Sequence, residues 1–243
     1  MPVVIITGAS SGIGAATARR LGSAGMVIVL AARRTDEMAA VARDIESNRG
    51  TAMVVPTDLR KPDDIAALID QAAAIDGRID VLVNNAGVGG KASILTDDAA
   101  VDAMLDVNLR APIRLMRAVV PIMKAQGAGA IVNIGSVAGE IGVAATYSAT
   151  KFGLRGLTDS VRRELAGSGI GVTLIEPGYI ATPFTGNRRR LPGPEIVAAA
   201  VERAIRRPRR RMVVPGRYRA AILAANALPA VTDRLYAARA ARR

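Results

Sequence analysis

The sequence predicts one α/β domain: a doubly wound parallel sheet of about seven strands with helices on both faces. Two observations support this class. Short apolar runs of four to seven residues alternate with longer helical segments from residue 3 to about residue 183. Strands covered by helices on both faces are expected to be apolar throughout, as these runs are. The second observation is size, because 243 residues with 50% apolar side chains can form one large core.

Each expected element follows from a local pattern. The apolar runs predict strands at residues 3–6, 26–32, 52–56, 79–83, 130–134 and 172–175, with an edge strand at 211–215. The helical segments are residues 15–21, 36–47, 62–75, 97–125, 147–166 and 194–206. Pro229 divides residues 217–243 into two short helical pieces, because proline cannot continue a helix.

The chain has no cysteine and no histidine. Their absence excludes disulfides, thiolate zinc sites and triads built on histidine, and we expect no metal site. Acid–base chemistry must therefore use Tyr, Lys, Asp or Glu. The first residues, MPVVIITGAS, lack the basic segment of a secretory signal, and no stretch is suited to span a membrane. We expect a cytoplasmic protein, with peripheral membrane association as an option.

A glycine-rich turn, TGASSGIG at residues 7–14, lies between the first expected strand and helix. Glycine permits positive φ and removes the Cβ that would collide with a pyrophosphate. The following helix offers free N–H groups and a partial positive charge to phosphates. An isolated turn of this kind can be merely structural, but its position on the first βα unit favours dinucleotide binding. The residues concerned are Gly8, Ser10, Ser11, Gly12, Ile13 and Gly14.

Four motifs in this order resemble the short-chain dehydrogenase/reductase family. They are TGxxxGIG at residues 7–14, NNAG at 84–87, YxxxK at 147–151, and Pro177-Gly178 followed by Thr182. The resemblance extends to about residue 183 and implies a Rossmann-type fold with a nicotinamide dinucleotide cofactor. We therefore expect residues 1–185 to form the NADP-binding and catalytic core, and residues 186–243 to form an Arg-rich lid, edge strand and tail of the same domain.

Arg33 and Arg34 follow the second expected strand, where dinucleotide enzymes choose between cofactors. A carboxylate there accepts hydrogen bonds from the ribose hydroxyls, whereas an arginine binds a ribose 2′-phosphate. No acid occurs before Asp36, and Arg33 resembles the residue of the NADP-preferring members. The pattern predicts NADP(H) in preference to NAD(H), although two arginines after a strand can also be a solvated turn.

The resemblance implies further cofactor contacts after the third, fourth and sixth strands. They are Asp58 and Leu59 beside the adenine ring; Asn85, Ala86 and Gly87 along the cofactor; Pro177, Gly178 and Ile180 at the carboxamide; and Thr182 near the pyrophosphate. Local sequence equally allows Asp58 to cap the helix expected from residue 62.

Tyr147 and Lys151 are expected on one face of a helix, one turn apart. An ammonium group near a phenol favours the phenolate and lowers the tyrosine pKa, which suits Tyr147 as a general acid or base. Ser136 ends the fifth strand, where parallel strands open into a ligand crevice. The resemblance implies that Ser136 orients the substrate oxygen and that Lys151 binds the nicotinamide ribose. It also implies that Asn108 holds a water in a proton relay.

Tyr147 follows Ser136 by eleven positions, about two fewer than is common in the family. Both residues are expected on regular elements, so we expect the shorter loop to change the pocket wall and to leave the two side chains in place.

The Arg-rich part, residues 186–243, differs in charge from the rest of the chain. Residues 1–185 hold 18 basic and 18 acidic side chains, whereas residues 186–243 hold 15 arginines and three acids.

These features predict an oxidoreductase that transfers a hydride between nicotinamide C4 and a ketone, aldehyde or secondary alcohol. The resemblance implies a homodimer or homotetramer formed through helices 97–125 and 147–166. The alternative is a catalytically idle protein that binds a membrane surface or a polyanion through its cationic tail. A nucleotide-sugar epimerase or dehydratase is disfavoured, because such enzymes usually have a longer substrate domain and a TGxxGxxG turn.

The tail itself allows three interpretations. It can be a solvated or oligomer-covering helix pair, or it can dock on an anionic membrane surface. Nucleic-acid binding is the least favoured, since Tyr218 and Tyr236 are its only aromatic residues beyond residue 186 and single-strand binders need stacking platforms.

Overall fold

A computed structural model describes residues 1–90, 93–186 and 190–240. Arg188, Arg189, Arg242 and Arg243 of the Arg-rich segment lie outside these residues. Within the described chain, seven strands form one sheet in the order β3-β2-β1-β4-β5-β6-β7, and every neighbouring pair is parallel. The strands are β1 (Val3–Thr7), β2 (Val27–Ala32), β3 (Thr51–Pro56), β4 (Val81–Asn84), β5 (Gly129–Ile134), β6 (Ile170–Pro177) and β7 (Arg211–Val214). The predicted doubly wound sheet is confirmed.

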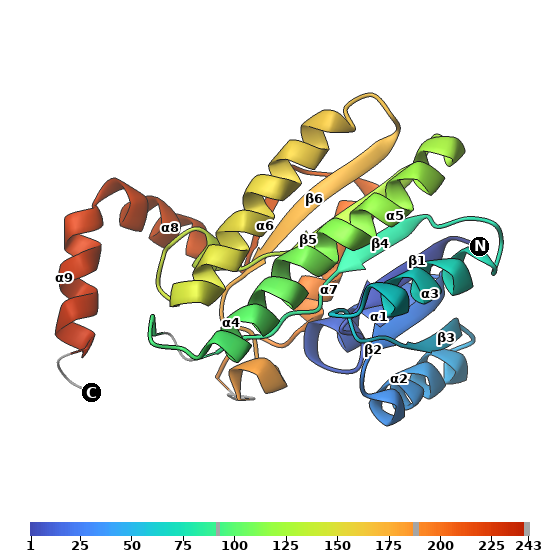
Figure 1. The fold of residues 1–243 in the computed structure, drawn as a ribbon, viewed down its shortest axis with the longest axis horizontal. Coiled ribbons are helices and arrows are strands. Elements are labelled where there is room, and N and C mark those ends of the chain that lie inside the picture. The colour runs from blue at the N-terminus through green and yellow to red at the C-terminus, as the bar shows by residue number, and fades with distance from the viewer. Residues whose placement is uncertain (91–92, 187–189, 241–243) are drawn as a thin grey trace.

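Helices cover both faces of this sheet (Figure 1). The helices are α1 (Gly12–Ser23), α2 (Thr35–Ser47), α3 (Pro62–Ala73), α4 (Asp98–Leu105), α5 (Ala111–Gln126), α6 (Ala145–Glu164), α7 (Glu195–Arg206), α8 (Tyr218–Ala227) and α9 (Pro229–Ala240). One core contains α1, α2 and α7 with Val4 and Ile6 of β1, and the other contains α3, α5 and α6 with Val3 and Ile5. Successive side chains of a strand point to opposite faces, so β1 is buried on both.

The helix expected at residues 97–125 contains a change of geometry that the sequence did not predict. Between α4 and α5 the backbone forms a π-helical turn, Asp106–Arg110. Such turns are rare, because the inserted residue breaks the regular α-helical hydrogen bonding. Those that do occur are often found at functional sites. Asn108 lies in the middle of this turn and is completely buried.

The last two helices form a C-terminal arm, residues 218–240, at one end of the molecule (Figure 1). Pro229 begins α9, so the predicted division into two short helices is confirmed. In α8 only Ile222 is buried, and none of residues 229–238 in α9 is buried. Among the described residues, no helix is both long and apolar enough to cross a membrane.

Candidate active site

A cavity of about 670 Å³ opens along the carboxyl ends of the central strands. Parallel strands place their ends at one edge of the sheet, so residues distant in sequence meet there. Except for Gly14 and Asn108, all the site residues predicted from sequence line this cavity. They are Gly8, Ser10, Ser11, Gly12, Ile13, Arg33, Arg34, Asp58, Leu59, Asn85, Ala86, Gly87, Ser136, Tyr147, Lys151, Pro177, Gly178, Ile180 and Thr182.

The glycine-rich turn closes tightly against the segment after β4. Gly8 has a φ of +65°, and a Cβ on it would lie 2.8 Å from the Cα of Ala86. Gly14 lies outside the cavity wall, where a Cβ would come within 2.3 Å of the Gly8 carbonyl oxygen. The Asn85 side chain braces the same turn, since its Nδ2 donates to the Thr7 carbonyl at 2.8 Å. Gly14 therefore lets helix α1 start directly beneath the turn.

Helix α1 differs from the next three helices at its N-terminus. Its first turn carries no acidic residue and its N-cap, Ser11, makes no side-chain cap, whereas α2, α3 and α4 all have a carboxylate in the first turn. The Ser10 and Ser11 hydroxyls instead accept hydrogen bonds from Arg34 Nη2, at 2.9 and 2.8 Å. Free N–H groups, a positive helix end and an arginine are suited to bind phosphate. These residues fit a dinucleotide pyrophosphate.

Asp58 lies in the same part of the cavity, and Arg60 neutralises it. Arg60 Nε donates to both carboxylate oxygens, at 2.9 and 3.1 Å. The Arg60 guanidinium is the main cause that lowers the Asp58 pKa to about 2, and the charge of Arg33 lowers it slightly further. The alternative role of Asp58 as a helix cap is wrong, because the N-cap of α3 is Lys61 without a side-chain cap. Within the described residues, Arg33 itself makes no ion pair.

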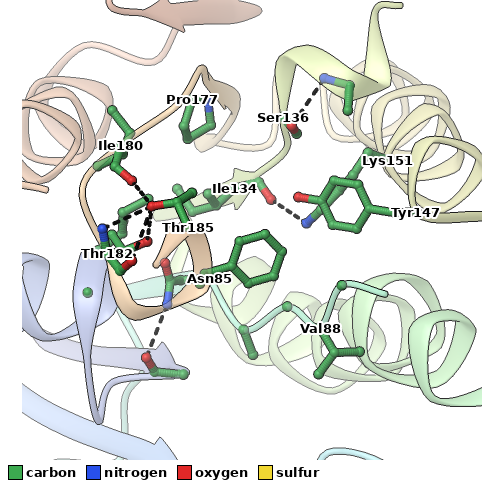
Figure 2. Close-up of a pocket in the computed structure, with 18 of the residues that line it drawn as sticks. Asn85, Val88, Ile134, Ser136, Tyr147, Lys151, Pro177, Ile180, Thr182 and Thr185 are labelled. Carbon is green, nitrogen blue, oxygen red and sulfur yellow. Dashed lines mark hydrogen bonds between the residues drawn. The ribbon is translucent and has the colours of Figure 1, made fainter. Parts of the chain in front are cut away.

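Ser136, Tyr147 and Lys151 converge at the end of β5 (Figure 2). Lys151 is 4% exposed, and its Nζ donates to the Ile134 carbonyl at 3.0 Å. The same Nζ lies 5.8 Å from the centre of the Tyr147 ring. The Ser136 side chain lies close enough to the Tyr147 hydroxyl to lower its pKa. A substrate oxygen in this position could therefore meet two hydroxyl groups beside a buried ammonium.

The Tyr147 pKa does not follow the sequence-based expectation. Burial raises the Tyr147 pKa above its ordinary value, and the neighbouring Ser136 side chain offsets only part of this rise. The expected lowering by Lys151 is not found. The Lys151 ammonium faces the ring and is bound by the Ile134 carbonyl, and burial lowers its own pKa to about 8. At neutral pH Tyr147 is consequently a phenol, able to donate a proton.

Asn108 supports this centre from behind the cavity wall. Its Oδ1 accepts from the Val88 backbone N–H and its Nδ2 donates to the Val88 carbonyl, both at 2.9 Å. Nδ2 also donates to the Thr150 hydroxyl on α6 at 3.1 Å. A Cβ on Gly87 would lie within 4 Å of both Asn108 Oδ1 and Lys151 Nζ. Asn108 thus connects the loop after β4 to the helix that carries Lys151, and its role in a proton relay stays a prediction.

The short loop between Ser136 and Tyr147 is packed directly on α6. Val137–Gly139 forms a 3-10 turn, and a Cβ on Gly139 would lie 2.9 Å from the Lys151 carbonyl carbon and oxygen. The Ser148 hydroxyl accepts from the N–H groups of Val143 and Ala144, at 3.2 and 3.0 Å. The loop therefore brings Ser136 and Tyr147 together despite its shortness.

A buried group of charges behind Ser136 was missed in the sequence. Glu140 and Glu176 are 3% and 1% exposed. Arg211 Nη1 lies 2.7 Å and Arg155 Nη1 lies 3.0 Å from Glu140 Oε1, and Arg211 Nε lies 3.2 Å from Glu176 Oε2. Burial, with the adjacent Glu140 carboxyl, raises the Glu176 pKa to about 9. Local sequence carries no signal for this group, since its members come from four separate segments.

Glu176 should make the protein less stable as pH rises. Its folded pKa of about 9 exceeds the ordinary value of 4.5, so the folded protein holds a proton that the unfolded chain loses between these pH values. Glu176→Gln cannot ionise, and we expect it to flatten this decline by up to about 1.4 kcal/mol per pH unit. Urea unfolding at pH 6, 7.5 and 9 measures the effect. Glu164→Gln, on the exposed end of α6, is the control, and equal slopes in wild type and Glu176→Gln would contradict the prediction.

Most of the aromatic residues that line the cavity were also not predicted from the sequence as site residues. Tyr179, Phe184, Tyr218 and Tyr236 line the cavity, although Tyr218 and Tyr236 were considered only as stacking platforms of a tail. A possible signal was rarity, because the chain has only four tyrosines and two phenylalanines.

The parallel, doubly wound sheet and its crevice define a Rossmann-type protein. The chain belongs to the short chain dehydrogenase family, whose model matches residues 2–192. It is 36% identical to the ketoacyl reductase HetN of Nostoc sp. over 222 residues, which covers 87% of this chain and 77% of that protein.

Two solved structures show the same fold. A metagenomic short-chain oxidoreductase in complex with NADP is 39% identical, with a TM-score of 0.78. The 3-ketoacyl-(acyl-carrier-protein) reductase from Brucella melitensis, complexed with NADH, is 28% identical, with a TM-score of 0.81. In both comparisons 88% of this chain and 96% of the other chain are covered. The predicted family and fold are confirmed, and the chain is an oxidoreductase of this family.

Proposed function

We propose that the protein is an NADP(H)-dependent oxidoreductase that interconverts a ketone or aldehyde with its alcohol. The observation that carries this proposal is that three reactive side chains and the glycine-rich turn meet in one cavity. The Ser136 hydroxyl, the Tyr147 phenol and the Lys151 ammonium lie in the same cavity as the glycine-rich turn. The alternative of an idle binding protein gives no reason for these three groups to meet. The ketoacyl reductases among the relatives support carbonyl chemistry.

The residues present fit a phosphorylated dinucleotide. The first turn of α1, with Arg34 and the two serines, would hold the pyrophosphate, and Arg33 would face a ribose 2′-phosphate. Asp58 is bound by Arg60 and Arg34 pairs with Glu37 at 3.3 Å, so Arg33 is the arginine here that has no ion pair among the described residues and can meet an anion. When bound, the nicotinamide would supply or accept the hydride.

The protein's own residues would manage the proton and the oxygen. Tyr147 would donate its phenolic proton to the substrate oxygen during carbonyl reduction and take it back during alcohol oxidation. Ser136 would orient that oxygen through its hydroxyl, and the buried Lys151 ammonium would bind the nicotinamide ribose. Because burial raises the Tyr147 pKa, the phenol carries the proton that carbonyl reduction requires at neutral pH.

The cofactor preference can be tested with Arg33→Asp. An aspartate repels a 2′-phosphate and accepts hydrogen bonds from ribose hydroxyls, so NADPH should bind at least about tenfold more weakly and NADH more tightly than in wild type. Titration followed by nicotinamide fluorescence measures both affinities. Arg43→Asp, an exposed substitution on α2 with the same change of charge, should leave the order unchanged. A wild-type protein that binds NADH more tightly than NADPH would refute the preference.

A further inference from the structure

Aromatic side chains are concentrated at the cavity. The chain has six of them, and five line this one cavity: Tyr147, Tyr179, Phe184, Tyr218 and Tyr236. Apart from Tyr147, these residues form what we call the aromatic collar, which is Tyr179, Phe184, Tyr218 and Tyr236. The collar residues come from the loop after β6 and from both helices of the C-terminal arm. The rarity of aromatic residues elsewhere indicates that the collar serves this site.

Charge is distributed unequally along the cavity. Arg33 follows β2 and Asp58 follows β3, whereas Ser136 follows β5. Three strand spacings, about 14 Å, separate the ends of β2 and β5. Near Tyr147 the described lining residues include one ionisable cation, Lys151, which the Ile134 carbonyl binds. The remaining wall at this end is mostly apolar, with Ala138, Ile141, Val143, Ala144 and Ile222.

Two of the collar rings rest on glycines. A Cβ on Gly178 would lie 2.1 Å from Tyr218 Cε2, and a Cβ on Gly89 would lie 2.8 Å from Phe184 Cζ. The Phe184 ring also contacts Tyr147, with ring centres 5.8 Å apart. The two rings therefore pack directly on the glycine backbone, and any larger residue at either glycine would push its ring away.

The other side of the collar is open to solvent. Tyr179 is 58% exposed, Phe184 57% and Tyr236 48%, although all three line the cavity. Large aromatic surfaces that remain in water are stabilised when an apolar ligand covers them. The Arg217 guanidinium carbon lies 5.6 Å from the centre of the Tyr218 ring, but Arg217 does not line the cavity. An ionised ligand would therefore lose its hydration at this end of the cavity, where the described lining residues offer no free partner of opposite charge.

We propose that the substrate is an uncharged, lipophilic carbonyl compound, with its carbonyl at Ser136 and Tyr147 and its apolar body against the aromatic collar and Ile222. This inference rests on the proposed function and gives its substrate class. Ile222 of α8 and Tyr236 of α9 bring the C-terminal arm into the cavity wall, so the arm determines how large an apolar body is accepted.

The first test compares substrates that differ in one property. For methyl ketones from 2-butanone to 2-decanone, kcat/KM with NADPH should rise about two- to fourfold per added methylene, until the chain extends beyond the collar. Ethyl acetoacetate should be reduced at least about 100-fold more efficiently than acetoacetate, which has the same ketone and a carboxylate. A flat series, or a preference for the acid, would overturn the inference.

The second test changes the collar. Tyr236→Ser and Ile222→Ser should each lower kcat/KM about tenfold more for 2-decanone than for 2-butanone, because only the long chain reaches these side chains. Leu235→Ser is the matched control, since Leu235 is 66% exposed on the same helix as Tyr236 and does not line the cavity. Equal losses for both ketones would refute the role of the arm.

The affinity for NADPH distinguishes a failure of the proposed substrate class from a failure of the proposed function. NADPH titration by fluorescence needs no carbonyl substrate. Tight NADPH binding with no dependence on chain length overturns the substrate class alone. A wild-type protein that binds no nicotinamide cofactor overturns the proposed function and with it the substrate class.

Discussion

Tyr147→Phe is expected to lower kcat for carbonyl reduction by about 10²- to 10⁴-fold, the usual contribution of a positioned general acid. The substitution removes one hydroxyl and keeps the ring that contacts Phe184, so the cavity should keep its shape. NADPH affinity, measured by nicotinamide fluorescence, should change little. Steady-state reduction of a ketone in excess NADPH gives the loss of kcat.

A second tyrosine of the same cavity provides the control. Tyr179 lines the cavity and is 58% exposed, so Tyr179→Phe also removes one hydroxyl without removing a ring. We expect it to retain most of its activity. If Tyr147→Phe also retained full activity, the proton would have to come from another group, and the assignment of Tyr147 would be wrong.

Gly14→Ala is expected to weaken NADPH binding by more than tenfold and to lower the free energy of unfolding by about 1–3 kcal/mol. The added Cβ would lie 2.3 Å from the Gly8 carbonyl oxygen and 2.6 Å from Asn85 Nδ2. Relief of this contact requires helix α1 to move away from the turn, so the N–H groups that face the phosphates would be displaced. Fluorescence titration and urea unfolding measure the two effects.

Gly156 in α6 is the matched control for the same substitution. It is a helical and exposed glycine, and a Cβ on it would meet nothing within 4 Å. Gly156→Ala should therefore raise the free energy of unfolding by about 0.5–1 kcal/mol, because alanine loses less conformational entropy than glycine in a helix. If Gly14→Ala were as harmless as Gly156→Ala, α1 would not need to pack against the turn.

The sheet and most of the candidate site could be predicted from sequence because their signals are local. Each buried strand is a short apolar run, and the observed bounds differ from the predicted ones by at most two residues at either end. The glycine-rich turn and the Tyr147–Lys151 pair are short motifs, and the end of a parallel strand is a predictable place for a ligand. The π-helical turn around Asn108 was not predictable, because no local pattern distinguishes it from an α-helix.

The sequence by itself determined the order of elements, the glycine-rich turn and the identity of the groups that can transfer a proton. Tertiary structure alone decided which distant residues share a wall and how deeply each is buried. It placed Tyr218 on Gly178, joined Glu140 to Arg211, and raised the Tyr147 pKa where the sequence had suggested a lower one. The physical reason is that strand and turn signals come from neighbouring residues, whereas desolvation and contact between segments exist only once the chain has packed.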